Sequence, residues 1–208
     1  MRISWLARAS FACALLAGVA TRVDAAPIIN NTGVVSPDVT ITFSEHVFAA
    51  ETLITNQYAD LGIEFAAGLY YDVQPDFFPD HFLANFTFEG ALNNPESIRF
   101  TAPVNAAALA LQSNPGTTTF TALLNGVVVE SFSTGTTLSF LPDLSHASDF
   151  YGFSGILFDE LKIENNGEGF FQMDNVQYTA VPEPASLLLL GAGVATLAAR
   201  RARRTARR

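Results

Sequence analysis

The sequence predicts an all-β fold, an antiparallel jelly-roll-like β-sandwich, on the basis of three observations. Apolar and polar residues alternate with a period of two over many short runs, the pattern of half-buried strands. Clusters of turn residues separate these runs, and no amphipathic helix of useful length interrupts them. Eighteen phenylalanines supply large apolar side chains for a core. Two packed antiparallel sheets account for all three observations.

About ten short strands are predicted between residues 38 and 180, which form the single domain that this length allows. The runs are VTITF from Val39, GIEFA from Gly62, LANFTFEG from Leu83, SIRFTA from Ser97, TTFTALLNGVVVESFS from Thr118, GILFDELKIE from Gly155 and GFFQMDNVQYTA from Gly169. APVNAAALALQ from Ala102 is alanine-rich but alternates, so it is also predicted as strand. Asn125-Gly126 predicts a hairpin with a type I′ turn, whose central residues need positive φ. Residues 26–37 are predicted to be a linker, and QPDFFPDHF from Gln74 an irregular loop.

The charge of the body is strongly negative. Residues 26–180 contain eighteen Asp and Glu against two basic residues, Arg99 and Lys162. Such a field repels phosphate backbones, so nucleic-acid binding is excluded, and it favours solubility and cation binding.

The first 25 residues have the features of a secretory signal peptide, expected as a helix. Arg2 and Arg8 form a positive region, an apolar stretch follows, and small residues precede the expected cleavage after Ala25, with Ala26 as the alternative. The only cysteine, Cys13, lies inside this segment. The mature chain is therefore expected to have no disulfide and no cysteine metal ligand.

The C-terminus, residues 181–208, differs in composition from the acidic body. Residues 185–199 are apolar and cover roughly 22 Å as a helix, short of the ~30 Å hydrocarbon core, so they span a bilayer only marginally. The arginines that follow are expected to stay on the cytoplasmic side: Arg200, Arg201, Arg203, Arg204, Arg207 and Arg208. One transmembrane helix, with the body outside, is the prediction.

Three parts follow one another at the C-terminus: the sequence Val181-Pro182-Glu183-Pro184-Ala185-Ser186, the predicted apolar helix and the arginine cluster. This order resembles the PEP-CTERM sorting signal of exported bacterial proteins. The resemblance implies cleavage near Pro182, Glu183 and Pro184 by exosortase, which makes the tail a transient anchor in the inner membrane. The body would then reach the cell surface or the extracellular matrix, as a non-enzymatic protein. A permanent anchor with an accidental Pro-Glu-Pro linker is the alternative.

Residues 38–180 more loosely resemble a β-sandwich of PEP-CTERM proteins and carbohydrate-binding modules. The matching stretches are Phe43-Ser44-Glu45, residues 55–65, and Met173-Asp174-Asn175-Val176. The resemblance implies a calcium ion shared by Glu45 and Asp174; the alternative is that both cap strand ends.

Extracellular polysaccharide is a second potential partner. Exposed aromatic rings in YYDVQPDFFPDHF, namely Tyr70, Tyr71, Phe77 and Phe78, are candidates for stacking on a sugar. The alternative places these rings in the core.

Catalytic motifs are weak. His46, His81 and His146 lack metal-ligand spacing, GFSG from Gly152 is one residue short of a nucleophile elbow, and DLSH from Asp143 is better explained as a loop. A carbohydrate-binding module, and less strongly a glycan-processing enzyme that uses a carboxylate pair, remain the alternatives.

Overall fold

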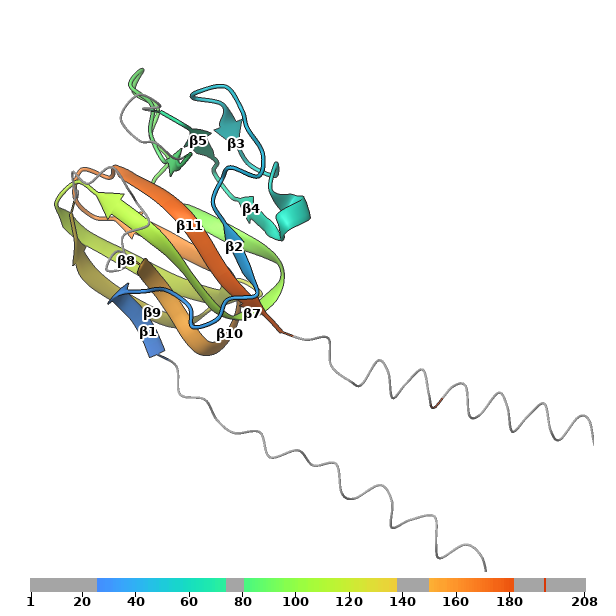
Figure 1. Cartoon of the computed structure of the whole chain (residues 1–208). Coiled ribbons are helices and arrows are strands. Elements are labelled where there is room, and N and C mark those ends of the chain that lie inside the picture. Colours follow the sequence, from blue (N-terminus) through green and yellow to red (C-terminus); the bar gives the residue numbers. More distant parts are fainter. Residues whose placement is uncertain (1–25, 74–80, 138–149, 182–192, 194–208) are drawn as a thin grey trace, which may run out of the picture.

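The computed structural model describes residues 26–73, 81–137, 150–181 and 193 (Figure 1). In these residues the chain forms eleven strands and a 3₁₀ turn at Ala59–Leu61. The strands are β1 (Ala26–Asn31), β2 (Val39–Ile41), β3 (Leu53–Ile54), β4 (Ile63–Phe65), β5 (Leu69–Tyr71), β6 (Leu83–Ala84), β7 (Glu96–Ser113), β8 (Gly116–Leu124), β9 (Val127–Thr136), β10 (Phe150–Asn165) and β11 (Phe171–Ala180). Every pairing between them is antiparallel, so the all-β prediction is confirmed.

The strands form one continuous hydrogen-bonded sheet in the order β3-β5-β6-β11-β7-β10-β8-β9. Beside this path, β1 pairs with β10, β2 with β11, and β4 with β7. β7 and β10 are the longest strands, with 18 and 16 residues. The two parts of each strand pair with different neighbours. The pairing of β7 with β10 shifts register between Ser154 and Phe158, where Gly155 adopts a positive φ of 77°. The sheet therefore bends at this point instead of remaining flat.

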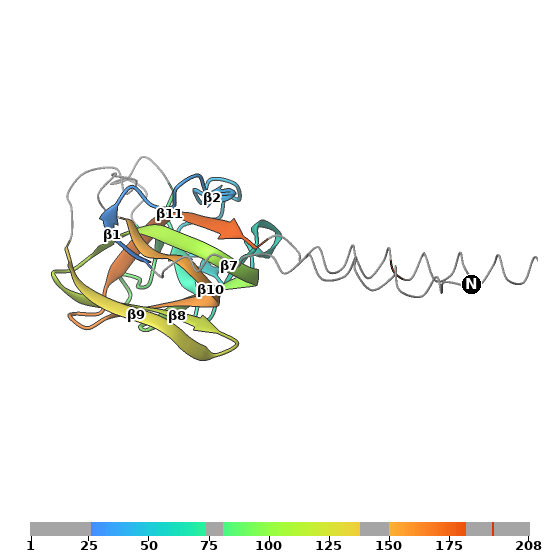
Figure 2. The same ribbon diagram turned by 90° about the horizontal axis from the view of Figure 1, so that it is seen from below.

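The bend divides the sheet into two layers that face each other across the core (Figure 2). In one layer, the first part of β7 pairs with β4 and with the second part of β10, and this part of β10 also pairs with β8. In the other layer, the rest of β7 pairs with β11 and with the first part of β10. Phe120 on β8 stacks on Tyr151 on β10 with ring centroids 5.2 Å apart, and Phe132 on β9 contacts Phe153 at 5.1 Å. These aromatic contacts join the layers, as in a β-sandwich. The jelly-roll order within it stays a prediction.

The prediction that residues 26–37 are a linker is wrong for its first half. β1 pairs with the first part of β10, and Ile28 is buried in a second apolar cluster on the outer side of the sheet. That cluster contains Val34, Ala106, Ala108, Ala110 and Phe150. The alanines of β7 leave room for the segment that holds Val34, so this segment packs against the sheet.

Two local predictions are confirmed. Asn125 and Gly126 join β8 to β9 with φ values of 52° and 77°, as a type I′ turn requires. The alanine-rich run from Ala102 lies within β7.

The predicted helix at residues 1–25 lies outside the described residues, as do the predicted helix at residues 185–199 apart from Gly193 and most of the loop from Gln74. In the part of the chain that the structure describes, no helix is long and apolar enough to cross a membrane.

Candidate functional site

The described part of the body ends at the residue before the Pro-Glu-Pro sequence. Ala180 pairs with Val104 on β7, and its N–H donates to Oδ2 of Asp38 at 3.0 Å. The N–H of Val181 lies 3.4 Å from the carbonyl oxygen of Pro103. Pro182, Glu183, Pro184 and the six arginines follow outside the described residues. The fold thus fixes the start of the tail without a spacer.

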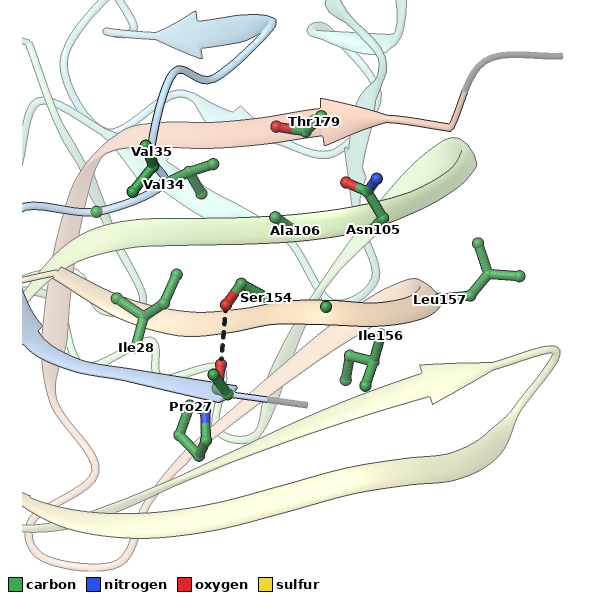
Figure 3. A pocket seen from close by; sticks show the side chains of 13 residues that line it. Pro27, Ile28, Val34, Val35, Asn105, Ala106, Ser154, Ile156, Leu157 and Thr179 are labelled. Carbon is green, nitrogen blue, oxygen red and sulfur yellow. Dashed lines mark hydrogen bonds between the residues drawn. The ribbon is translucent and has the colours of Figure 1, made fainter. Parts of the chain in front are cut away.

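A groove of about 610 Å³ lies beside this exit, on the outer side of the sheet (Figure 3). Its floor includes Ala26, Ser154, Ala106 and Thr179, which lie in one cross-strand row of β1, β10, β7 and β11. The hydroxyl of Ser154 donates to the carbonyl oxygen of Ala26 at 3.2 Å. The expected N-terminus of the mature chain and the start of the tail therefore lie at one end of the sheet, three strands apart.

One wall of the groove is held by Gln177 on β11. The N–H of Val34 donates to Oε1 of Gln177 at 2.9 Å. Gly33 has a φ of 90°, and a Cβ there would collide with the same oxygen. Glycine is therefore required for this close approach. The groove is mainly apolar, with Asn105, Ser154 and Thr179 as its polar side chains.

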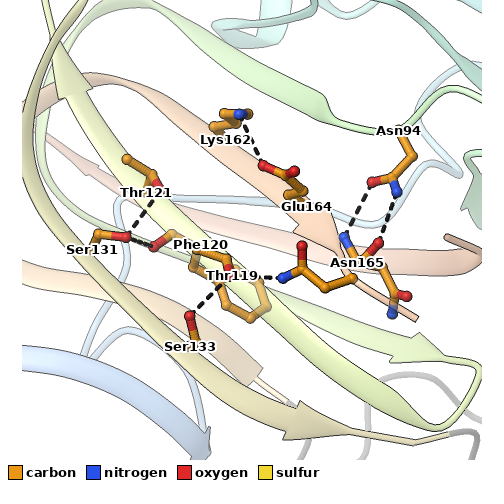
Figure 4. Close-up of polar contacts among 10 residues, drawn as sticks. Asn94, Thr119, Phe120, Thr121, Ser131, Ser133, Lys162, Glu164 and Asn165 are labelled. Carbon is orange, nitrogen blue, oxygen red and sulfur yellow. Dashed lines mark hydrogen bonds and ion pairs between the residues drawn. The ribbon is translucent and has the colours of Figure 1, made fainter.

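A second feature is a ladder of hydroxyl groups on the solvent side of β8 and β9 (Figure 4). Oγ1 of Thr119 lies 2.8 Å from Oγ of Ser133, and Oγ1 of Thr121 lies 3.1 Å from Oγ of Ser131. Phe120, between the two threonines, points into the core and is fully buried. Each hydroxyl can donate and accept, so the ladder can bind another hydroxylated molecule.

Charged side chains of β10 and β7 continue this surface. In register, Lys162 lies beside Thr121 and Glu164 beside Thr119, and Nζ of Lys162 donates to Oε2 of Glu164 at 3.0 Å. One row further on, Nε of Arg99 lies 3.5 Å from Oε2 of Glu160. We call this surface the polar face: Arg99, Thr119, Thr121, Ser131, Ser133, Glu160, Lys162 and Glu164. It carries both basic residues of the stretch from 26 to 180.

Asparagines hold one end of the polar face in place. The side chain of Asn94 donates to the carbonyl oxygen of Asn165 at 2.8 Å and accepts from its N–H at 3.1 Å. Asn166 Nδ2 donates to Thr119 Oγ1 at 3.0 Å. These bonds fix the turn after β10 against β8. The spacing of Thr117, Thr119, Thr121, Ser131 and Ser133 along the sequence is a signal for this surface, whereas the predicted sugar contacts were all aromatic residues.

The two predicted calcium ligands have local partners. Oε1 of Glu45 accepts from the N–H and hydroxyl of Thr42 at 2.9 and 3.1 Å. Oδ1 of Asp174, a buried residue, accepts from the N–H of Asn175 at 2.6 Å. These are the contacts of the capping alternative. Among the described residues no three acidic or histidine side chains are grouped so as to hold a metal ion. Calcium binding by this pair stays a prediction.

Of the four aromatic residues predicted to contact sugar, two are described. Tyr71 is fully buried, and its hydroxyl donates to the carbonyl oxygen of Phe43 at 3.2 Å. This corrects the prediction for Tyr71, because β5 alternates and turns Leu69 and Tyr71 inward. Tyr70 is half-buried and packs on Val73, Phe82 and Ala84. Phe77 and Phe78 lie outside the described residues.

The buried tyrosines have raised pKa values. Burial raises the pKa of Tyr71 to about 12, with a further contribution from Asp72. Burial also raises the pKa of Tyr58 above its usual range, and the next contributions come from Tyr71 and Glu45. The hydroxyl of Tyr58 donates to the carbonyl oxygens of Phe43 and His46, each at 3.1 Å. Both tyrosines therefore stay neutral and act as core hydrogen-bond donors.

The remaining titratable side chains of the described residues do not converge on one site. Nε2 of His46 lies 3.0 Å from Asp60, and Nδ1 of His81 lies 2.6 Å from Asp72. Burial raises the pKa of Glu96, whose Oε1 accepts from the N–H groups of Ala67 and Ser97. Glu96 lines neither the groove nor the polar face. Its contacts are those of a structural residue.

Comparison with known proteins identifies the tail alone. Residues 180–204 match the PEP-CTERM protein-sorting motif. No curated protein and no solved structure gives a significant match to the chain. The chain thus carries a PEP-CTERM sorting motif directly after its last strand, and this motif supports exosortase-dependent sorting of an exported protein.

Proposed function

We propose that this chain is a non-enzymatic protein of the cell surface or extracellular matrix, with a jelly-roll-like β-sandwich as its functional body. Residues 185–199 anchor it in the inner membrane with the body outside. Exosortase then cuts near Pro182-Glu183-Pro184 and releases the body. The match of residues 180–204 to the sorting motif carries this proposal.

The position of the motif in the fold supports it. Val181 is the last residue of the continuous described stretch and its N–H is directed at the carbonyl oxygen of Pro103, and the three residues of the motif core follow it directly in sequence. A proline on each side of Glu183 disfavours helix through this tripeptide. An apolar segment of marginal length, with arginines that reach the headgroups, suits an anchor that is discarded later.

Replacing Glu183 by alanine tests the proposal. Apolar length and arginines are unchanged, so insertion should persist while processing fails and the uncut precursor accumulates in membranes. Glu89→Ala is the matched control, because it removes one exposed carboxylate from a loop of the body. Mass spectrometry of the exported wild-type protein can contradict the proposal. If peptides from Leu187 to Ala199 are still attached to most of the exported protein, the tail is a permanent anchor.

The polar face favours carbohydrate binding as a second candidate function. The hydroxyl oxygens of each cross-strand pair lie 2.8 and 3.1 Å apart, and successive pairs are about 6.7 Å apart along the strands, a scale suited to sugar hydroxyls. The acidic body repels anionic polymers, so a neutral extracellular polysaccharide is the proposed ligand.

The test is a Thr119→Val, Thr121→Val double variant, which removes two hydroxyls and keeps β-branched side chains. Its retention on insoluble neutral polysaccharide should fall, whereas Thr101→Val, a control on exposed β7 surface, should bind like the wild type. Equal retention of all three proteins would remove the polar face from consideration. Release of reducing sugar by the wild type would instead indicate a glycan-processing enzyme.

A further inference from the structure

Exposed apolar side chains gather at the end of the body from which the tail leaves. Val127 is 66% exposed, Val128 58%, Leu157 45% and Val181 38%. We call these four residues the apolar end. Single exposed apolar residues are ordinary on a protein surface, but a group at one end of a molecule indicates a contact.

Pairing across the sheet brings the apolar end together. Val104 pairs with Ala180 on one side and with Phe158 on the other, so Val181 and Leu157 flank the same stretch of β7. The N–H of Asn125, in the turn before Val127, donates to Asp159 at 3.0 Å. Figure 3 shows Leu157 on the side toward which β11 and the hairpin of β8 and β9 both extend.

The tail restricts how far this end can lie from a membrane. Only residues 182–184 separate Val181 from the apolar segment that begins at Ala185. Fully extended, three residues span about 10 Å. The headgroup layer on one side of a bilayer is roughly 5–8 Å thick. A short apolar segment draws its flanking residues toward the hydrocarbon, so the distance is reduced further.

We propose that, while the tail is inserted, the body rests end-on on the outer surface of the lipid bilayer, with the apolar end in the headgroup layer. This inference rests on the membrane anchoring in the proposed function. The acidic body has no electrostatic attraction to anionic lipid, so contact is confined to the apolar end. The inserted tail keeps the apolar end at a high effective concentration relative to the lipid surface, so a weak contact is enough. Cutting the tail ends that contact and frees the body.

Tryptophan fluorescence tests the orientation, because the chain from residue 26 onward contains no tryptophan. Leu157→Trp and, independently, Val127→Trp place the reporter at the apolar end. Phe88→Trp is the control. Phe88 is 66% exposed and follows β6, beside the start of β11, where the N–H of Asn85 donates to the carbonyl oxygen of Phe171. The length of β11, about 33 Å, separates it from the exit.

Each precursor, lacking only residues 1–25, is reconstituted with its tail into phosphatidylcholine vesicles that contain brominated lipid. The two reporters at the apolar end should show blue-shifted emission and a loss of intensity from bromine quenching, whereas the emission of the Phe88→Trp control should match that of an indole in water. Cleaving the tail should abolish the quenching. Unquenched reporters at both positions in protein that floats with the vesicles would overturn the end-on orientation alone. Protein that fails to float would overturn the anchoring, and the orientation with it.

Discussion

Replacing Phe120 by alanine tests whether the two layers are held together by the aromatic contacts across the core. Phe120 is fully buried and stacks on Tyr151 at 5.2 Å and on Phe132 at 5.1 Å. Truncating a buried phenylalanine costs about 3–5 kcal/mol, from lost transfer energy and the cavity left behind. For a domain of this size, each kcal/mol corresponds to about 2–4 °C, so the melting temperature should fall by roughly 6–20 °C.

Thr121→Ala is the matched control, one residue further along β8 and on the opposite face. It removes an exposed hydroxyl contact with Ser131 and should cost about 1 kcal/mol or less. Thermal and urea unfolding of the released body, followed by circular dichroism, measure the changes in melting temperature and in free energy of unfolding. Equal effects of the two substitutions would refute the assignment of Phe120 to the core and of Thr121 to the surface.

Three further predictions concern pH, turn geometry and calcium. Burial raises the pKa of Glu96 in the folded state, so its stabilising contribution is complete below the unfolded pKa and is lost as pH rises through the folded one. Glu96→Gln should remove that loss, seen as a smaller decline of the urea midpoint as the pH rises above the ordinary pKa of a glutamate. Gly126→Ala, at a φ of 77° with open space around it, should cost about 1–2 kcal/mol by backbone strain alone, which chemical denaturation measures. Calcium binding at Glu45 and Asp174 predicts a melting temperature that falls on chelation and recovers with calcium, and Asp174→Asn should abolish the difference; a curve indifferent to calcium would leave both carboxylates as local caps.

The alternation in the alanine-rich run predicted this part of β7 correctly, although both faces of the strand are covered by apolar residues. Ala107, Leu109 and Leu111 face the main core, while Ala106 and Ala108 face the outer cluster. The local sequence of β1, in contrast, does not indicate a strand. Proline and asparagines suggest a loop there, and pairing with β10, 119 to 128 residues away in sequence, decides its conformation.

The register between β8 and β9 that forms the polar face could not be predicted from local sequence. The two-residue turn pairs Leu124 with Val127 and would place Thr119 opposite Phe132. A bulge between Ala122 and Leu123 shifts the register by one, so that Thr119 faces Ser133 instead. Nothing in the sequence marks this bulge, and without it the hydroxyl groups would not be opposite one another.

The position of β11 has a consequence for export. This last strand lies in the interior of the sheet, between β6 and β7, and also pairs with β2. A chain that crosses a membrane from its N-terminus cannot complete such a sheet until residue 180 has emerged, because long-range pairings form only when both strands are present. The next residues to arrive are those of the sorting motif. Completion of folding and presentation of the cleavage sequence are therefore nearly simultaneous, and a chain truncated before β11 would lack both.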